Sequence, residues 1–160
     1  PKTPSEPRPA PIPSMIRFSK MADYGVLLLG HFARHPDDLA SAAELAEAYH
    51  MPAAVVRNLL KAFGRAGLLE SRRGQNGGYR LAAEPSEVSL LDILGVVDGP
   101  VQLIDCALDD LGSVGQGCEY EDVCLSRSPM VGVHKRIVAF LRDITLAELI
   151  TDDSPIPLSS

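Results

Sequence analysis

An amphipathic helix runs directly into a hairpin pattern between residues 52 and 81. The apolar stripe of this helix recurs three or four residues apart: Val56, Leu59, Leu60 and Phe63. Pro52 suits the first turn and Gly67 suits the end, because proline lacks an N–H and glycine tolerates a left-handed backbone. Two short runs, 68–73 and 79–81, then flank a glycine-rich loop, which predicts a β-hairpin.

Two further helices are predicted ahead of this helix and hairpin. Ser19 opens the first, which ends before Pro36, and Ser41 opens the second, which reaches about Tyr49. Glu44 stands three residues after Ser41, which is the spacing of a capping box. Three helices and a hairpin in this order predict a mainly α fold with a small β-hairpin wing. This is the winged helix-turn-helix, whose third helix enters the major groove of DNA.

The rest of the chain predicts two more helices. Ser89 and Asp92 cap one over 90–97, and the last helix runs from about Met130 to Thr145. Its apolar seam consists of Met130, Val133, Ile137, Phe140 and Ile144, widened by Val138 and Leu141. Such a seam favours a partner helix, which predicts a long C-terminal dimerisation helix and a homodimer. Packing of the seam against its own domain is the alternative.

The length of 160 residues suits one main domain with a small appendage. Six prolines without apolar periodicity predict a disordered tail over 1–14. We expect a winged helix-turn-helix DNA-binding region over 15–84, a cysteine loop with the dimerisation helix over 85–150, and a flexible tail over 151–160. No apolar run approaches the roughly 20 residues of a membrane span, and no secretion signal is found, which predicts a cytoplasmic protein without a membrane partner.

Opposite charges are segregated along the chain. The net charge of −6 alone disfavours nucleic acid, yet residues 57–80 hold six basic side chains and one acid, whereas residues 82–125 hold ten acids and no Lys or Arg. A local basic patch attracts DNA phosphates, so we predict DNA contacts from Arg57, Lys61, Arg65, Arg72 and Arg73. The first three share one helical face, and the last two enter the glycine loop. A solvated outer face is the alternative interpretation.

Three cysteines, Cys106, Cys118 and Cys124, lie in a segment rich in glycine and aspartate. An odd number in a protein expected in the cytoplasm argues against a disulfide framework. The segment alone slightly favours a metal site over buried free thiols, a thiol sensor or structural zinc. Since the neighbours are acidic, they are not expected to lower a thiol pKa, which counts against a reactive thiol.

No enzyme motif is present, which predicts a non-enzyme: we find no phosphate-binding loop, no HExxH zinc motif and no nucleophile–base–acid set. The histidines give little evidence of a functional site. His31 and His35 are expected at the end of the first helix, where cationic imidazole complements the helix dipole. His134 is expected on the surface of the last helix.

Several motifs together resemble the Rrf-type regulators, the family that includes IscR and NsrR. The matching segments are 18–25, 59–61 with 66–69, 73–74 with 77–81, 89–90 with the helix that follows, and the three-cysteine loop. The resemblance covers 16–150. Residues 144–148 resemble in particular the branch that regulates SUF iron–sulfur assembly operons.

The resemblance implies a homodimer on a palindromic operator, and an iron–sulfur cluster of two-iron or four-iron form on Cys106, Cys118 and Cys124. The fourth ligand varies in this family. In some relatives an acidic residue of the opposite subunit supplies it, and Asp23 matches that position; complementing the helix dipole is the alternative role. The other candidates for the fourth ligand are Glu119, Glu121, Asp122 and His134. The chain departs from the pattern in its longer spacing between Cys106 and Cys118, and in Arg127, which replaces a histidine ligand of some relatives.

These features and the resemblance predict a DNA-binding repressor of iron–sulfur cluster assembly genes that senses its own cluster. A regulator of other genes that senses nitric oxide or thiol redox state is the first alternative. A metal-binding adaptor without operator binding is the second.

Overall fold

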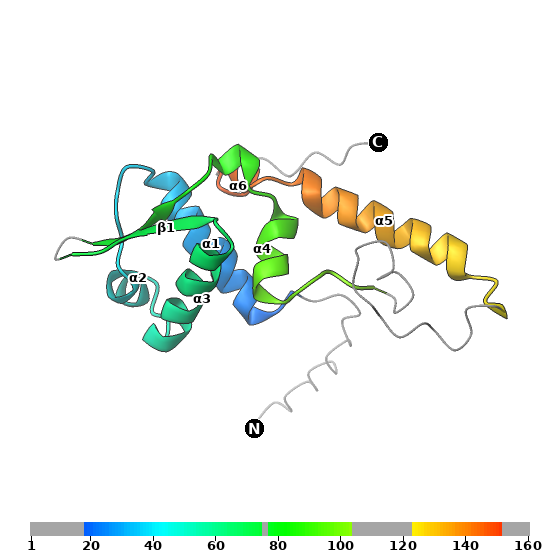
Figure 1. The fold of residues 1–160 in the computed structure, drawn as a ribbon, viewed down its shortest axis with the longest axis horizontal. Helices are drawn as coiled ribbons and strands as arrows, with labels where there is room; N and C mark the ends of the chain where they lie inside the picture. Colours follow the sequence, from blue (N-terminus) through cyan, green and yellow to red (C-terminus); the bar gives the residue numbers. More distant parts are fainter. Residues whose placement is uncertain (1–17, 75–76, 104–122, 152–160) are drawn as a thin grey trace, which may run out of the picture.

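The computed structural model describes residues 18–74, 77–103 and 123–151. Its elements are α1 (Lys20–Arg34), α2 (Ala42–Ala48), α3 (Ala53–Arg65), β1 (Leu69–Arg72), β2 (Gly78–Leu81), a 3-10 turn (Pro85–Glu87), α4 (Leu90–Val97), α5 (Arg127–Asp143) and α6 (Leu146–Leu149). Figure 1 shows α1–α4 and the hairpin gathered at one end, with α5 extending away from them. The mainly helical fold with a small antiparallel hairpin is confirmed. No helix in the described ranges is both long and apolar enough to cross a membrane.

Side-chain caps define the starts of three helices as predicted. Ser19 caps α1. Ser41 with Glu44 begins α2, and Ser89 with Asp92 begins α4, and each pair forms a full capping box. In each box the serine hydroxyl accepts from a backbone N–H, and the acid accepts from the serine N–H, so two otherwise unpaired donors are satisfied.

The last helix differs from its prediction. α5 begins at Arg127, and its regular backbone stops at Asp143. Thr145 then caps the separate short helix α6, because its hydroxyl accepts from the Glu148 N–H and the Glu148 carboxylate accepts from the Thr145 N–H. The sequence prediction missed this third capping box.

The larger hydrophobic core lies among α1, α2, α3 and the hairpin. The predicted stripe of α3 is buried in it: Val56, Leu59, Leu60 and Phe63. α1 contributes Leu28, Leu29 and Phe32, while α4 and α6 contribute Ile93 and Leu146. The core of the winged helix therefore draws on residues from both of the regions expected from the sequence.

A third extended segment holds the hairpin against the helices. β1 and β2 pair antiparallel, with Arg72 opposite Gly78. Tyr79 exchanges two backbone hydrogen bonds with Ala40, at 2.9 and 3.1 Å. A Cβ on Gly78 would lie 2.8 Å from the Ala40 carbonyl oxygen, so a side chain at this position would displace the wing.

A smaller apolar cluster joins α5 to α4 and α1. Its buried members are Ala22, Leu90, Leu94, Leu141 and Ile144. Two short backbone hydrogen bonds close this contact: the Leu90 N–H donates to the Ile144 carbonyl at 2.8 Å, and the Leu146 N–H donates to the Val88 carbonyl at 2.7 Å. The C-terminal end of α5 is thereby anchored, and its other end extends away from the core (Figure 1).

One part of the predicted apolar seam of α5 is buried against the rest of the protein, and the other part is exposed to solvent. Leu141 and Ile144 are buried, and Ile137 packs partly on the same cluster. The exposed members are Met130, Val133 and Phe140, at 41%, 45% and 44% of their surface. At about 100° per residue these three lie within about 80° of one another, so they form one strip, here called the α5 strip. Packing on its own domain thus covers only part of the seam.

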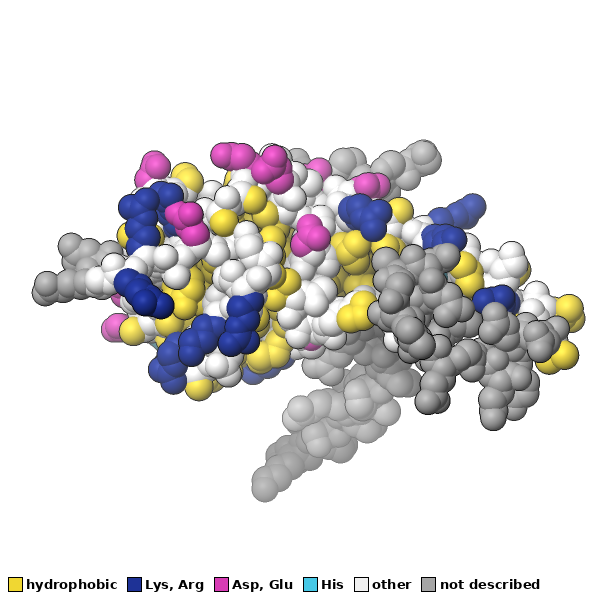
Figure 2. All heavy atoms as spheres, in the orientation of Figure 1, with side chains coloured by type: hydrophobic (Ala, Val, Ile, Leu, Met, Phe, Trp, Pro, Cys, Tyr) yellow, Lys and Arg dark blue, Asp and Glu magenta, His cyan; other side chains and the backbone are white. Residues whose placement is uncertain are grey.

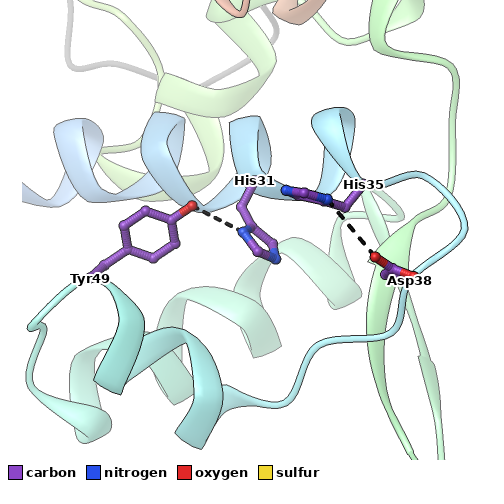
Figure 3. A network of polar contacts seen from close by, with 4 residues as sticks. All are labelled: His31, His35, Asp38 and Tyr49. Carbon is purple, nitrogen blue, oxygen red and sulfur yellow. Dashed lines mark hydrogen bonds and ion pairs between the residues drawn. The ribbon is translucent and has the colours of Figure 1, made fainter.

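A polar contact links the end of α1 to the end of α2 (Figure 3). His31 Nδ1 lies 3.0 Å from the Tyr49 hydroxyl, and the centroids of the His31 and His35 rings are 4.8 Å apart. His35 in turn lies 3.9 Å from the Asp38 carboxylate. Burial, and secondly the charge of His35, lower the pKa of His31. The expectation of a cationic imidazole is therefore wrong for His31, because desolvation favours the neutral ring.

We expect the unfolding free energy to decrease as the pH falls below 6.5, the ordinary pKa of His31. The unfolded chain takes up a proton there, whereas the folded chain takes it up only at lower pH. The unfolded state then binds more protons, so stability is lost through this window and levels off below the folded pKa. Urea unfolding from about pH 8 to about pH 5 measures the effect. His31→Gln should show a shallower dependence, and equal slopes would contradict this role of His31.

Candidate nucleic-acid interface and cysteine site

The outer face of α3 is a basic stripe. Arg57, Lys61 and Arg65 are exposed on the side opposite the buried stripe, and α3 contains no acidic residue. None of the three forms an ion pair with another described residue. Figure 2 shows Lys and Arg side chains gathered over the end of the molecule that holds α3 and the hairpin. The cations predicted on this helix are therefore available to an anionic ligand.

The hairpin adds two more exposed cations. Arg72 ends β1 and Arg73 follows it. Arg80 is different, because it faces Glu70 across the hairpin and forms an ion pair with that carboxylate. Within the described chain, five of the six basic residues of 57–80 are thus free of ion pairs, and these five are the predicted DNA contacts.

Cys124 precedes α5, whereas Cys106 and Cys118 lie outside the described residues. The Cys124 Sγ lies 3.4 Å from the Ser126 hydroxyl. Hydrogen bonds from Ser126, with smaller contributions from Arg127, lower the pKa of the Cys124 thiol. The expectation that no neighbour lowers a thiol pKa is therefore wrong for Cys124. The thiol therefore ionises more readily to the thiolate, which is the form that binds metal.

His134 also differs from its prediction. Its side chain is only 5% exposed, since it lies one helical turn before Ile137 and two before Leu141 on the face of α5 that packs on α4. Its Nδ1 has no hydrogen-bond partner among the described residues. A buried polar atom without a partner costs free energy and calls for an explanation. The spacing from Leu141 was the signal in the sequence that would have identified this buried position.

Asp23 is exposed in the first turn of α1, where an acid complements the helix dipole. The described part of the chain holds no group of three or more His, Cys, Asp or Glu side chains placed to bind a metal ion. Two of the three predicted cysteine ligands lie outside that part. The ligand set, including Asp23, therefore stays a prediction.

Known proteins share both the sequence pattern and the fold. The profile of the Rrf2 family, described as an iron-dependent transcriptional regulator, matches residues 18–152. The regulator IscR of Vibrio atlanticus is 31% identical over 118 residues, which are 73% of this chain and 64% of the relative. NsrR of Halalkalibacterium halodurans is 26% identical over 142 residues, 86% of this chain and 92% of the relative. The solved structure of T. potens IscR has a TM-score of 0.62 at 26% identity, and the match covers 84% of this chain and 86% of that one.

The coverage differs between relatives. The chain spans between 59% and 64% of the length of the first curated relatives that it matches. The family match itself extends from just before α1 to just beyond α6, and so includes every described helix and the hairpin. The chain therefore belongs to the Rrf2 family of transcriptional regulators.

Proposed function

We propose that this protein is a homodimeric, operator-binding repressor of iron–sulfur cluster assembly genes, which senses a cluster held by Cys106, Cys118 and Cys124. The observation that carries the DNA-binding part is the set of five unpaired cations on α3 and the wing. A recognition helix in the major groove and a wing on the backbone bring such cations to phosphates and base edges. Membership of the Rrf2 family supports a regulatory role. To this role we add that the protein represses transcription and that its targets are iron–sulfur cluster assembly genes.

The donor groups suit the proposed cluster. Cys124 offers an accessible thiol with a lowered pKa, which favours the thiolate form that binds a cluster. His134 offers a buried imidazole nitrogen without another partner, and imidazole replaces thiolate at iron in some clusters. Asp23 offers a carboxylate, which is a harder ligand. When bound, the cluster supplies a centre that responds to oxidation and to the supply of iron.

Cluster state can reach the DNA-binding surface through α5. Cys124 lies three residues before the first residue of α5. The other end of α5 is joined to the start of α4 by the backbone hydrogen bond from the Leu90 N–H to the Ile144 carbonyl. α4 in turn packs on α1 and α3. A bound cluster that favours one placement of α5 would shift the dimer between states of different operator affinity, as any ligand with differential affinity does.

Replacing Arg72 and Arg73 together with Ala should weaken binding to all DNA sequences alike. Both guanidinium groups are exposed and unpaired within the described chain, so their loss removes phosphate contacts and the release of counterions. The slope of log affinity against log salt should become shallower by about 2. Fluorescence anisotropy with a labelled duplex at several salt concentrations measures it. Arg80→Ala is the matched control, because Arg80 is already paired with Glu70. An unchanged slope in the double variant would refute the role of the wing.

A thiol-redox sensor is the second candidate, and the lowered pKa of the accessible Cys124 thiol favours it. Purification without oxygen, followed by iron, sulfide and absorption measurements, separates the two. A cluster sensor carries iron and acid-labile sulfide, whereas a thiol sensor carries neither. A nitric oxide sensor would carry the cluster but control other genes, and an adaptor would carry it without binding an operator.

A further inference from the structure

Asn58 places an uncharged amide within the basic stripe of α3. Its side chain is exposed, one helical turn after Ala54 and one turn before Lys61 or Ala62. At about 100° per residue, five exposed positions fall within about 100° of the helix circumference. These are Ala54, Arg57, Asn58, Lys61 and Arg65. Asn58 makes no side-chain hydrogen bond to another residue of the described chain, so its donor and its acceptor are both available.

The stability of α3 does not account for this asparagine. Asn is a weak helix former, because its amide competes for nearby backbone groups, and Asn58 lies well inside the helix rather than at a cap. A merely solvated position would be filled better by Gln, Glu or Lys. In the major groove, by contrast, the Asn amide matches the N6 donor and N7 acceptor of adenine in a bidentate pair.

The first turn of α3 is shaped for close approach to a surface. Pro52, Ala53 and Ala54 are all exposed and carry no long side chain. The N-terminal part of a recognition helix is the part that reaches base edges. Residues 54–58 would therefore lie nearer the floor of the groove than Lys61 and Arg65, whose longer side chains suit phosphates.

We propose that Ala54, Arg57 and Asn58 read base edges, and that each operator half-site presents a thymine methyl group, a guanine and an adenine to them. Asn58 pairs with adenine N6 and N7, Arg57 with guanine O6 and N7, and Ala54 contacts the thymine methyl. This inference rests on the proposed DNA binding and adds the chemistry of the recognised sequence.

Selection from a pool of duplexes with a randomised core, using the full chain, tests the protein side. The wild-type protein should enrich half-sites that contain fixed G·C and A·T pairs. Asn58→Ala should lose the preference at one A·T position and bind the enriched duplex about 5- to 150-fold more weakly. Arg57→Ala should lose the G·C preference instead. Lys61→Ala is the control, and it should weaken binding to all duplexes while the preferences persist.

Base analogues test the same contacts from the DNA side. In the enriched duplex, 7-deazaadenine removes one acceptor and uracil in place of thymine removes one methyl group. Each should weaken wild-type binding, and the 7-deazaadenine effect should vanish in Asn58→Ala. Unchanged preferences in Asn58→Ala, or wild-type binding insensitive to every such replacement, would overturn the inference; the second measurement needs no variant to fold. Failure of the wild-type protein to enrich any duplex would instead overturn the proposed DNA binding.

Discussion

Phe140→Asp should convert the proposed homodimer to a monomer. Phe140 is 44% exposed and belongs to the α5 strip with Met130 and Val133, which remains exposed in the single chain. An interface between two copies would cover this strip, and a carboxylate placed there would be buried without a partner. The cost is on the order of several kcal/mol, and in a two-fold dimer the change enters once from each protomer. Sedimentation velocity at micromolar concentration measures the outcome.

The same substitution should weaken operator binding by about 100-fold or more, because a monomer would reach only one half-site of the proposed palindromic operator. Ala139→Asp is the matched control, since it adds the same charge at an exposed neighbour about 100° away around the helix. Ile137 is a less suitable target, because it packs partly on the cluster formed with α4, and its replacement would also damage the protomer. If Phe140→Asp stays dimeric with wild-type operator affinity, the α5 strip is not the interface.

The winged helix was predictable because its elements carry local signals. The serines that cap α1, α2 and α4 act within their own first turn, so the sequence alone locates them. The stripe of α3 reports its buried face, and Gly67 adopts the positive φ of 78° expected beyond its end. Such signals depend on neighbours three or four residues away rather than on the tertiary fold.

The end of the last helix was not predictable from periodicity. Ile144 continues the apolar spacing of the seam, yet its backbone is extended, with φ −77° and ψ 117°. Its burial comes from the cluster with α4, and its carbonyl accepts from the Leu90 N–H. Apolar spacing indicates that a residue is buried, but it does not indicate which backbone conformation buries it. The apolar spacing of the seam therefore continued to Ile144 although the helix ends at Asp143.

The candidate DNA-binding and cysteine sites were also only partly predictable from the sequence. The five cations could be chosen from their sequence positions, but the neutralisation of Arg80 depends on the strand register that places it opposite Glu70. The burial of His134 depends on the packing of α5 against α4. The lowered pKa of Cys124 depends on how the chain turns through Ser126. Charge is a property of a residue, whereas burial and hydrogen bonding belong to the folded chain.

Cys124→Ala should abolish the proposed iron–sulfur cluster. The proposed site has three thiolates and one further ligand, and losing a thiolate leaves one iron without its strongest type of ligand. Protein purified without oxygen should lose its visible absorption, its iron and its acid-labile sulfide, and its operator affinity should no longer respond to oxidation. Ser126→Ala is the matched control, because it removes the hydroxyl near Sγ and keeps the thiol. A variant that lacks Cys124 but retains a full complement of iron and sulfide would exclude this cysteine from the site.

Nitrogen hyperfine coupling in the EPR spectrum distinguishes His134 from the carboxylate candidates, such as Asp23, as the fourth ligand of the proposed cluster. The His134 Nδ1 is buried without a partner, whereas the Asp23 carboxylate is exposed, so we expect the histidine to be the ligand. His134→Gln should then make the cluster labile and remove nitrogen hyperfine coupling from the pulsed EPR spectrum of the reduced protein. Asp23→Ala should leave both unchanged. The reverse pattern, or a wild-type cluster without nitrogen coupling, would exclude His134. A purely structural role for His134 predicts a lower unfolding temperature in His134→Gln with an unchanged cluster spectrum.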